Sequence, residues 1–339
     1  MIQNQWYAVL SSKQVKKNKM IGVTRLSEKL VFWRDNGDIV HCIFDKCCHR
    51  GASLCAGKLV NHHIECPFHG FVYDGSGKVI RIPANGQNAN VAENYRVNAY
   101  RARDAYGLIW VWYGDYNADL PEIPFFEELT NGFTYGEISE TWSVHYTRAI
   151  ENQLDVVHLP FVHKTTIGRG NKTLVNGPVA KWKENRMTFY VKNEVDRGQR
   201  PEKPDEVEDF EKLFHLQLQM PNIWQNIISD QLRIFAAFAP VDEENTHIYL
   251  RFYQKFMRVP LLTQLVNDIG AMMNRVILHQ DRRVVQTQLP RKSELKMKEN
   301  LVQGDLPILE FRKRRDQLRE DARATPHKTD EVESDHLVS

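Results

Sequence analysis

Two short segments carry the strongest signal in this 339-residue sequence: Cys47-Cys48-His49-Arg50-Gly51 and Cys66-Pro67-Phe68-His69-Gly70. Together they give the pattern C-x-H, a gap of 16 residues, and C-x-x-H. All five cysteines of the chain lie between Cys42 and Cys66. A disulfide framework would spread an even number of cysteines through a small secreted chain. The odd number and the tight clustering therefore indicate a metal site.

Two thiolates and two imidazoles suit either zinc or a [2Fe–2S] cluster in which two histidines replace two cysteines on one iron. Zinc fingers usually group ligands of one type, whereas each segment here offers one Cys and one His. That arrangement suits two irons, because each iron can take one ligand of its own type from each segment. Gly51 and Gly70 close the two segments and permit tight turns.

These segments resemble the Rieske motif of oxygenase components. Respiratory Rieske proteins carry a further cysteine in each segment, and the matching positions here hold Ala52 and Phe68. The resemblance implies four ligands for one [2Fe–2S] cluster: Cys47, His49, Cys66 and His69. The remaining cysteines are expected to be small buried residues: Cys42, Cys48 and Cys55.

The overall composition excludes several classes of protein. Lys and Arg number 45 and Asp and Glu 43, so the formal charge of +2 gives no reason to expect a nucleic-acid partner. No uninterrupted apolar run approaches the roughly 20 residues that a membrane-spanning helix needs, and no membrane association is expected. Residues 1–6 lack the basic and apolar regions of a secretory signal. We therefore expect a cytoplasmic protein.

The pattern of elements changes near the Pro-containing stretch 120–124. Before it, short apolar runs such as 30–34 and 39–44 are separated by turn residues and predict strands. The length suggests two domains. With the resemblance, we expect a Rieske domain over 1–116, a catalytic domain over 117–322 and a disordered tail over 323–339.

The second part is expected to mix helices and strands. A helix is predicted over 143–158, and strands over 187–193, 212–220, 232–239 and 247–256. Apolar residues recur at helical spacing from Leu261 to Gln288, which predicts a long helix that stops before Pro290. The fold class is therefore α+β: an all-β Rieske domain, then an α+β catalytic domain with an antiparallel sheet and a long C-terminal helix, which the resemblance implies to be helix-grip-like.

A second candidate metal site begins at Asp155-Val156-Val157-His158. Asp155 and His158 are three residues apart and would share one helix face. His163 lies about 140° from His158 around an ideal helix, so both reach one ion only if the helix is interrupted. Pro160 supplies that interruption, because it disfavours continued helix at the residue before it. The alternative is a pair of ordinary histidines near a helix end.

Asp281 is the best candidate for a third ligand. It lies on the apolar stripe of the predicted long helix, beside Leu278 and Val285. An unpaired buried carboxylate is costly, and a metal ion would compensate for it. A salt bridge to Arg282 or Arg283 is the alternative. Two histidines and one carboxylate form a facial triad that leaves open positions on Fe(II).

The spacing Asn152-x2-Asp155-x2-His158-x4-His163 is similar to the catalytic domain of Rieske non-haem iron oxygenases. The resemblance implies that His158, His163 and Asp281 bind one mononuclear Fe(II). It further implies that Asp155 hydrogen-bonds His69 of the partner subunit and relays electrons between subunits, with Asn152 in a supporting role. A homotrimer is the assembly that this arrangement implies.

The chain lacks a G-x-G-x-x-G nucleotide loop and a second cysteine set, so a separate reductase, with or without a ferredoxin, must deliver electrons from NAD(P)H. In length, the sequence looks like the phthalate and vanillate O-demethylase-like branch of the ring-hydroxylating oxygenases. That likeness implies an O2-dependent monooxygenase that hydroxylates, or removes O- or N-methyl groups from, a small aromatic or heterocyclic compound. The alternatives are a cis-dihydroxylating dioxygenase, a Rieske electron carrier with a non-catalytic second domain, and a zinc-stabilised binding module.

Several apolar residues are candidates for a substrate pocket, although ordinary core packing is the commoner role for such residues: Leu218, Met220, Trp224, Phe235, Phe238, Met273 and Ile277. Arg233 and Arg251 are candidate partners for a substrate carboxylate. Exposed arginines on strands are the commoner alternative for both.

Overall fold

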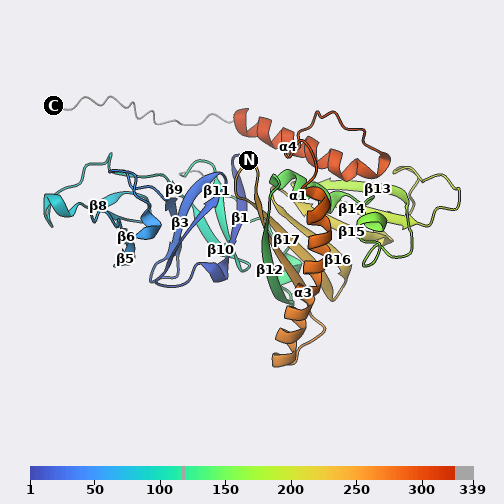
Figure 1. Ribbon diagram of the computed structural model, residues 1–339, viewed down its shortest axis with the longest axis horizontal. Helices are drawn as coiled ribbons and strands as arrows, with labels where there is room; N and C mark the ends of the chain where they lie inside the picture. Colours follow the sequence, from blue (N-terminus) through green and yellow to red (C-terminus); the bar gives the residue numbers. More distant parts are fainter. Residues whose placement is uncertain (117–118, 325–339) are drawn as a thin grey trace.

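The protein is described by a computed structural model that covers residues 1–116 and 119–324. Figure 1 shows small sheets at one end of the molecule and a large sheet with the long helices at the other. The expected tail over 323–339 begins too early, because Arg323 and Ala324 still belong to a helix. Residues 325–339 of that expected tail lie outside the described residues.

The N-terminal part consists of three small antiparallel sheets with the strand orders β1-β11-β10, β2-β3-β4-β9 and β5-β6-β7-β8. The strands are β1 (Gln5–Ser11), β2 (Met20–Arg25), β3 (Glu28–Arg34), β4 (Val40–Phe44), β5 (Lys58–Val60), β6 (His63–Glu65), β7 (Val72–Tyr73), β8 (Val79–Arg81), β9 (Ala99–Tyr100), β10 (Ala102–Ala105) and β11 (Leu108–Tyr113). Short 3-10 turns interrupt them at η1 (Ser12–Gln14), η2 (Leu54–Ala56) and η3 (Pro83–Asn85).

Strand β3 shows how this part holds together. Val31 and Trp33 face the core beneath the two cysteine–histidine segments, whereas Leu30 and Phe32 face a second core with residues of β1 and β11. Side chains alternate between the faces of a strand, so a strand that is apolar at every position is buried on both faces. The segments that carry the cysteines therefore rest on a packed support.

The second part is one seven-stranded antiparallel sheet with the order β12-β18-β17-β16-β15-β14-β13. Its strands are β12 (Thr134–Trp142), β13 (Leu174–Lys183), β14 (Arg186–Glu194), β15 (Phe214–Gln219), β16 (Ile223–Ser229), β17 (Leu232–Pro240) and β18 (Thr246–Gln254). The helices are α1 (Tyr146–Leu154), α2 (Leu159–Val162), α3 (Pro260–Val285) and α4 (Leu306–Ala324), with 3-10 turns at η4 (Glu127–Thr130), η5 (Phe210–Lys212) and η6 (Gln303–Asp305). The expected α+β fold class is confirmed.

The two faces of the large sheet have different partners. On β17, Ile234 and Phe238 point into the core that the sheet shares with α1, α3 and α4. Phe235, between them, points to the opposite face and packs in a core with Trp6 and Trp110 of the N-terminal part. One face of the sheet is thus covered by helices and the other by the first part of the chain.

Helix α3 is less buried than its apolar pattern predicts. Leu261, Met272 and Met273 are 89%, 62% and 68% exposed, whereas Leu278 and Asp281 are buried. Figure 1 shows that the first turns of α3 extend beyond the strands of the sheet, which accounts for the exposure of Leu261. Among the described residues, none of the helices combines the length and the apolar character needed to span a membrane.

Candidate metal centres and substrate cavity

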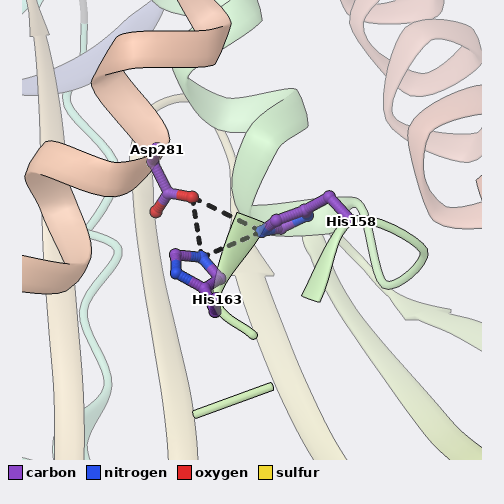
Figure 2. Close-up of side chains that lie close together, drawn as sticks. All are labelled: His158, His163 and Asp281. Atoms are coloured by element: carbon purple, nitrogen blue, oxygen red, sulfur yellow. Dashed lines mark hydrogen bonds and ion pairs between the residues drawn. The ribbon is translucent and has the colours of Figure 1, made fainter. Parts of the chain in front are cut away.

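Three side chains from two distant parts of the chain converge beside the large sheet. His158 and His163 flank α2, and Asp281 comes from α3 (Figure 2). Asp281 Oδ1 lies 2.8 Å from His163 Nε2 and 3.4 Å from His158 Nε2, and the two imidazole nitrogens are 3.2 Å apart. His163 and Asp281 are buried, and His158 is partly buried. The structure thus brings together the three residues that the sequence singled out as candidate iron ligands.

The turn that positions the two histidines differs from the expected one. Helix α1 ends at Leu154, and Asp155 is already extended. Its Oδ1 accepts hydrogen bonds from the N–H groups of Val157 at 2.7 Å and His158 at 3.1 Å. The helical break therefore lies at Asp155, and the prediction that Pro160 causes it is wrong. Pro160 lies in the first turn of α2, where its missing N–H costs little.

The charges at this site favour a bound cation. Burial lowers the pKa of His158, but the carboxylates of Asp155 and Asp281 outweigh burial and raise the pKa to about 9. Burial raises the pKa of Asp281, but His158 and His163 outweigh it and lower the pKa. Among the described residues, Asp281 Oδ1 has no hydrogen-bond donor, although both imidazole Nε2 atoms lie within 3.4 Å of it. Two imidazoles and a carboxylate with this spacing fit a divalent metal ion such as Fe(II).

Gln280 orients one of the candidate ligands, and sequence reasoning missed it. Its Oε1 lies 2.8 Å from His163 Nδ1 and accepts a hydrogen bond from Thr166 Oγ1 at 2.9 Å. An amide oxygen only accepts hydrogen bonds, so His163 Nδ1 carries the ring proton. Nε2, which faces Asp281 and His158, is then left with its lone pair. The polar residue beside Asp281 was the only sequence signal for this contact.

The two cysteine–histidine segments form a matched pair of loops. Cys47 N–H donates to Ala52 O at 2.8 Å, and Cys66 N–H donates to Phe71 O at 2.8 Å. Gly51 and Gly70 have φ values of +75° and +70°, a conformation that glycine adopts without strain. The two loops therefore have the tight turns that their glycines predicted.

Within these loops, the thiols face inward and the imidazoles outward. Cys47 and Cys66 are buried, whereas His49 and His69 are exposed, with ring centroids 4.5 Å apart. Burial raises the pKa of the Cys66 thiol, while the N–H groups of Phe68 and His69 donate to its sulfur and act in the opposite direction. Amide donors around a buried sulfur fit a metal-bound thiolate.

The other cysteines are not all buried as expected. Cys42 is buried, Cys55 is intermediate and Cys48 is exposed. Tyr73 Oη contacts both Cys47 Sγ at 3.1 Å and Cys48 Sγ at 3.2 Å. Cys48 lies in the turn that follows Cys47, and its residue is exposed although its sulfur contacts Tyr73.

A cavity of about 590 Å³ adjoins His158, His163 and Asp281. Asn152 and Asp155 also line it, and Asn152 Nδ2 is buried without a hydrogen-bond partner among the described residues. The cavity walls come from α1, α2, α3 and the helix-covered face of the large sheet. A volume of this size suits a small organic molecule.

The candidate pocket residues divide into two groups. Trp224, Phe238 and Ile277 line the cavity. Leu218, Met220 and Phe235 lie in the cores, and Met273 is exposed on α3.

The two arginines considered for a substrate carboxylate are buried rather than strand-exposed, and neither is among the residues that line the cavity. Arg251 Nε donates to Glu137 at 2.6 Å, and its other nitrogens donate to the carbonyl oxygens of Tyr106 and Gly107. Arg233 lies over the ring of Phe133. Both arginines therefore hold the structure together.

Comparison with known proteins adds independent information. Residues 5–101 match the model of the Rieske [2Fe-2S] domain, and residues 142–321 match that of the vanillate O-demethylase oxygenase C-terminal domain. Among known relatives, the chain is 32% identical over 166 residues to protein TIC 55 of Arabidopsis thaliana and 33% identical over 172 residues to the dicamba O-demethylase oxygenase component of Stenotrophomonas maltophilia. Each match covers 48% of this chain, and the chain spans only 30% and 48% of those relatives.

The fold is also shared with a solved structure. NdmA of Pseudomonas putida CBB5 superposes with a TM-score of 0.76 at 23% identity, over 94% of this chain and 91% of that one. The expected resemblance to the vanillate O-demethylase-like branch is confirmed by the two domain matches. The chain therefore belongs to the Rieske oxygenase family whose members combine a Rieske [2Fe–2S] domain with the vanillate O-demethylase oxygenase C-terminal domain.

Proposed function

We propose that this protein is the terminal oxygenase of a multicomponent Rieske system. It would use O2 and electrons from a separate reductase, directly or through a ferredoxin, to hydroxylate or demethylate a small aromatic or heterocyclic compound. The observation that carries this proposal is the convergence of His158, His163 and Asp281 on the wall of a cavity, in a chain that also has a Rieske domain. The same observation argues against a pure electron carrier, which needs no second site.

Each set of residues has a defined role in this proposal. Cys47, His49, Cys66 and His69 would hold the [2Fe–2S] cluster, and His158, His163 and Asp281 would hold Fe(II). When bound, the cluster supplies single electrons and the iron supplies a centre for O2 activation. The division into a cluster domain over 1–116 and an iron domain over 117–322 follows from this assignment.

The chain's own residues prepare the iron site. Gln280 fixes the tautomer of His163, so that Nε2 faces the metal position. Asp281 and the two histidines themselves line the cavity. Its apolar walls, including Phe238 and Ile277, exclude water from the place where substrate would lie.

Asp155 is proposed to connect the two metal centres across a subunit boundary. Burial raises its pKa, but His158 and the N–H groups of Val157 and His158 outweigh burial and lower it, so the side chain is a carboxylate at neutral pH. Asp155 Oδ1 lies 3.6 Å from His158 Nδ1. Figure 1 shows β5, β6 and β8, which flank the cluster segments in the sequence, at one end of the molecule, with β3, β10 and β1 between them and α1 and α3. That separation supports transfer between subunits and hence a homotrimer, with His69 exposed for docking.

Relatives support the substrate class. One relative is named a dicamba O-demethylase component, and NdmA has been solved with caffeine. A substituted arene and a methylated heterocycle are both compatible with a cavity of about 590 Å³. A cis-dihydroxylating reaction would use the same three ligands, and no specific contact favours it.

Metal analysis of the anaerobically purified protein tests the proposal. We expect about three irons and two acid-labile sulfides per chain, with a Rieske-type EPR signal on reduction. About two irons with two sulfides would support the electron carrier instead. Zinc without sulfide would establish the zinc-stabilised module and overturn the proposal.

A further inference from the structure

The polar groups that line the cavity are arranged for a particular kind of molecule. Strand β16 contributes Trp224 and Asn226 to the cavity wall. They are two residues apart and so share one face of the strand. Ile223 and Gln225, which alternate with them, point away: Ile223 packs in the core next to the N-terminal part, and Gln225 Nε2 donates to Glu128 Oε1 at 2.5 Å.

Both cavity-facing residues carry a polar atom without a partner. Trp224 Nε1 and Asn226 Oδ1 are buried and make no hydrogen bond within the described residues. Trp224 as a whole residue is 5% exposed. Buried polar groups are normally paired, and an orphaned one indicates a missing partner. The indole N–H can only donate and the amide oxygen can only accept, so the missing partner must offer one acceptor and one donor.

The charges around the cavity show where an anionic group would find no partner. Arg169 and Lys172 line the cavity but are exposed, which places them at its mouth. Lys192 is held by Glu202 at 3.3 Å and Glu194 at 3.5 Å. The wall next to Trp224 and Asn226 is formed by apolar side chains such as Ile234 and Phe238. A carboxylate buried there would lose its hydration without gaining a cation.

We propose that this cavity selects an uncharged, planar aromatic compound that carries both a hydrogen-bond acceptor and an N–H or O–H donor, with Trp224 and Asn226 as its recognition groups. A lactam-containing heterocycle has this chemistry. The ligand's acceptor atom accepts a hydrogen bond from Trp224 Nε1–H, and its donor group donates one to Asn226 Oδ1. The aromatic rings of the ligand lie against Phe238 and Ile277. This inference rests on the proposed function, because it treats the cavity as the substrate site.

Three bicyclic probes separate the contribution of hydrogen bonding to affinity from the effect of a negative charge. Quinolin-2-one offers a carbonyl and an N–H, naphthalene offers neither, and naphthalene-2-carboxylate adds a charge. Their dissociation constants are measured by ligand-observed NMR on the full-length protein, with cluster and iron content quantified in the same sample. One net hydrogen bond contributes about 0.5–1.5 kcal/mol, or roughly 2- to 10-fold in affinity. We expect quinolin-2-one to bind tightest and the carboxylate weakest.

Two variants assign the preference to the named residues. Trp224→Phe and Asn226→Leu should each lower the affinity for quinolin-2-one by roughly 2- to 10-fold and leave the affinity for naphthalene nearly unchanged. Trp182→Phe, on β13 outside the cavity lining, is the matched control and should change neither. Circular dichroism and iron content show that each variant is folded.

Three outcomes would overturn the inference: tighter binding of the carboxylate than of quinolin-2-one, a quinolin-2-one preference that survives both substitutions, or no binding of quinolin-2-one at millimolar concentration. Because binding needs no turnover, these outcomes are distinct from failure of the proposed function. That failure would appear as missing iron or sulfide in the same sample.

Discussion

A single amide governs how His163 presents its metal-binding nitrogen. Gln280 Oε1 accepts from His163 Nδ1 at 2.8 Å and from Thr166 Oγ1 at 2.9 Å. A residue that hydrogen-bonds to a metal-binding histidine fixes the tautomer of the ring, and its loss typically lowers metal affinity about 10- to 100-fold. We expect Gln280→Leu to lower Fe(II) affinity by about that factor, as measured by competition with a chelator.

Two further variants sharpen this prediction. Gln280→Glu keeps an acceptor opposite His163 Nδ1 and should keep most of the affinity. Gln264→Leu, on the exposed part of the same helix, should have no effect, because Gln264 bonds only to the neighbouring Asp268 among the described contacts. An unchanged affinity in Gln280→Leu would contradict the assigned role.

At this scale, motif spacing singled out His158 and His163, whereas Asp281 was singled out by its place on the apolar stripe of the long helix and by the family resemblance. Asp281 is far from the two histidines in sequence, and the structure places the three side chains within contact distance. Gln280 and the break at Asp155 were not predictable, because each depends on two particular side-chain hydrogen bonds. Such bonds leave no periodic trace in the sequence.

Helix α1 begins with a histidine that is buried in its neutral form. His145 is 1% exposed and caps the helix by accepting a hydrogen bond from Thr147 N–H. Burial lowers its pKa to about 3; Lys292 and Arg315 also lower it, while Glu243 acts in the opposite direction. The unfolded chain binds this proton near pH 6.5. The stability that neutral His145 contributes is therefore complete above pH 6.5 and lost as pH falls toward 3.

This titration predicts an acid-dependent loss of stability. At pH 5, the preference of the unfolded state for the proton costs about 2 kcal/mol. His145→Asn keeps a hydrogen-bond acceptor for the helix cap and removes the titrating group. Between pH 7 and pH 5, the free energy of unfolding of this variant should therefore fall by about 2 kcal/mol less than that of the wild-type protein. Urea unfolding at the two pH values measures the difference. Identical pH dependence in both proteins would show that His145 is not the group responsible.

The inner side of α1 carries a buried ion cluster. Glu151 accepts from Arg148 at 3.0 Å and from Arg312 of α4 at 2.7 Å, and all three residues are at most 4% exposed. Removing one partner of a buried pair typically costs about 3–5 kcal/mol. We expect Glu151→Gln to lower the free energy of unfolding by about 3 kcal/mol, because Glu299 still neutralises part of the charge.

A surface pair on α4 provides the comparison. Glu310→Gln removes a contact with the exposed Lys313 and should cost less than about 1 kcal/mol. Urea unfolding of the two variants measures both values. Equal losses would mean that the buried cluster contributes no more than a surface pair.

Strand β13 and helix α4 were not predicted from the sequence, and each omission has an identifiable cause. Strand β13 contains Gly177-Pro178, which resembles a turn, and the structure accommodates it as an irregularity between Asn176 and Val179. Helix α4 is strongly charged, so its pattern indicates a solvated helix. Arg312 and Arg315 are nevertheless buried, because Glu151 and Glu294 neutralise them. Pairing of charges across elements is a tertiary property that local patterns do not show.

Over the whole molecule, the elements next to the two candidate metal centres lie apart: β6, which precedes Cys66, is at one end, and α3, which carries Asp281, lies beyond β3 and β1 (Figure 1). Transfer between subunits predicts that two defective chains complement each other. Co-expressed Cys66→Ser and Asp281→Ala chains, purified through two different tags, would pair the cluster of one chain with the iron of the other. Cluster reoxidation by O2 should then be faster than in the Asp281→Ala assembly alone. A rate equal to that background would mean that transfer between subunits does not occur.

The iron site itself is tested most directly by the EPR spectrum of the nitric oxide adduct of the reduced protein. NO binds ferrous iron that has an open position, and a 2-His-1-carboxylate site supplies one. We predict a high-spin ferrous-nitrosyl signal in the wild-type protein. In Asp281→Ala that signal should be absent, while the Rieske signal persists. A wild-type protein with full iron and no nitrosyl signal, or an Asp281→Ala protein that retains it, would contradict the assignment of His158, His163 and Asp281 as the oxygen-activating site.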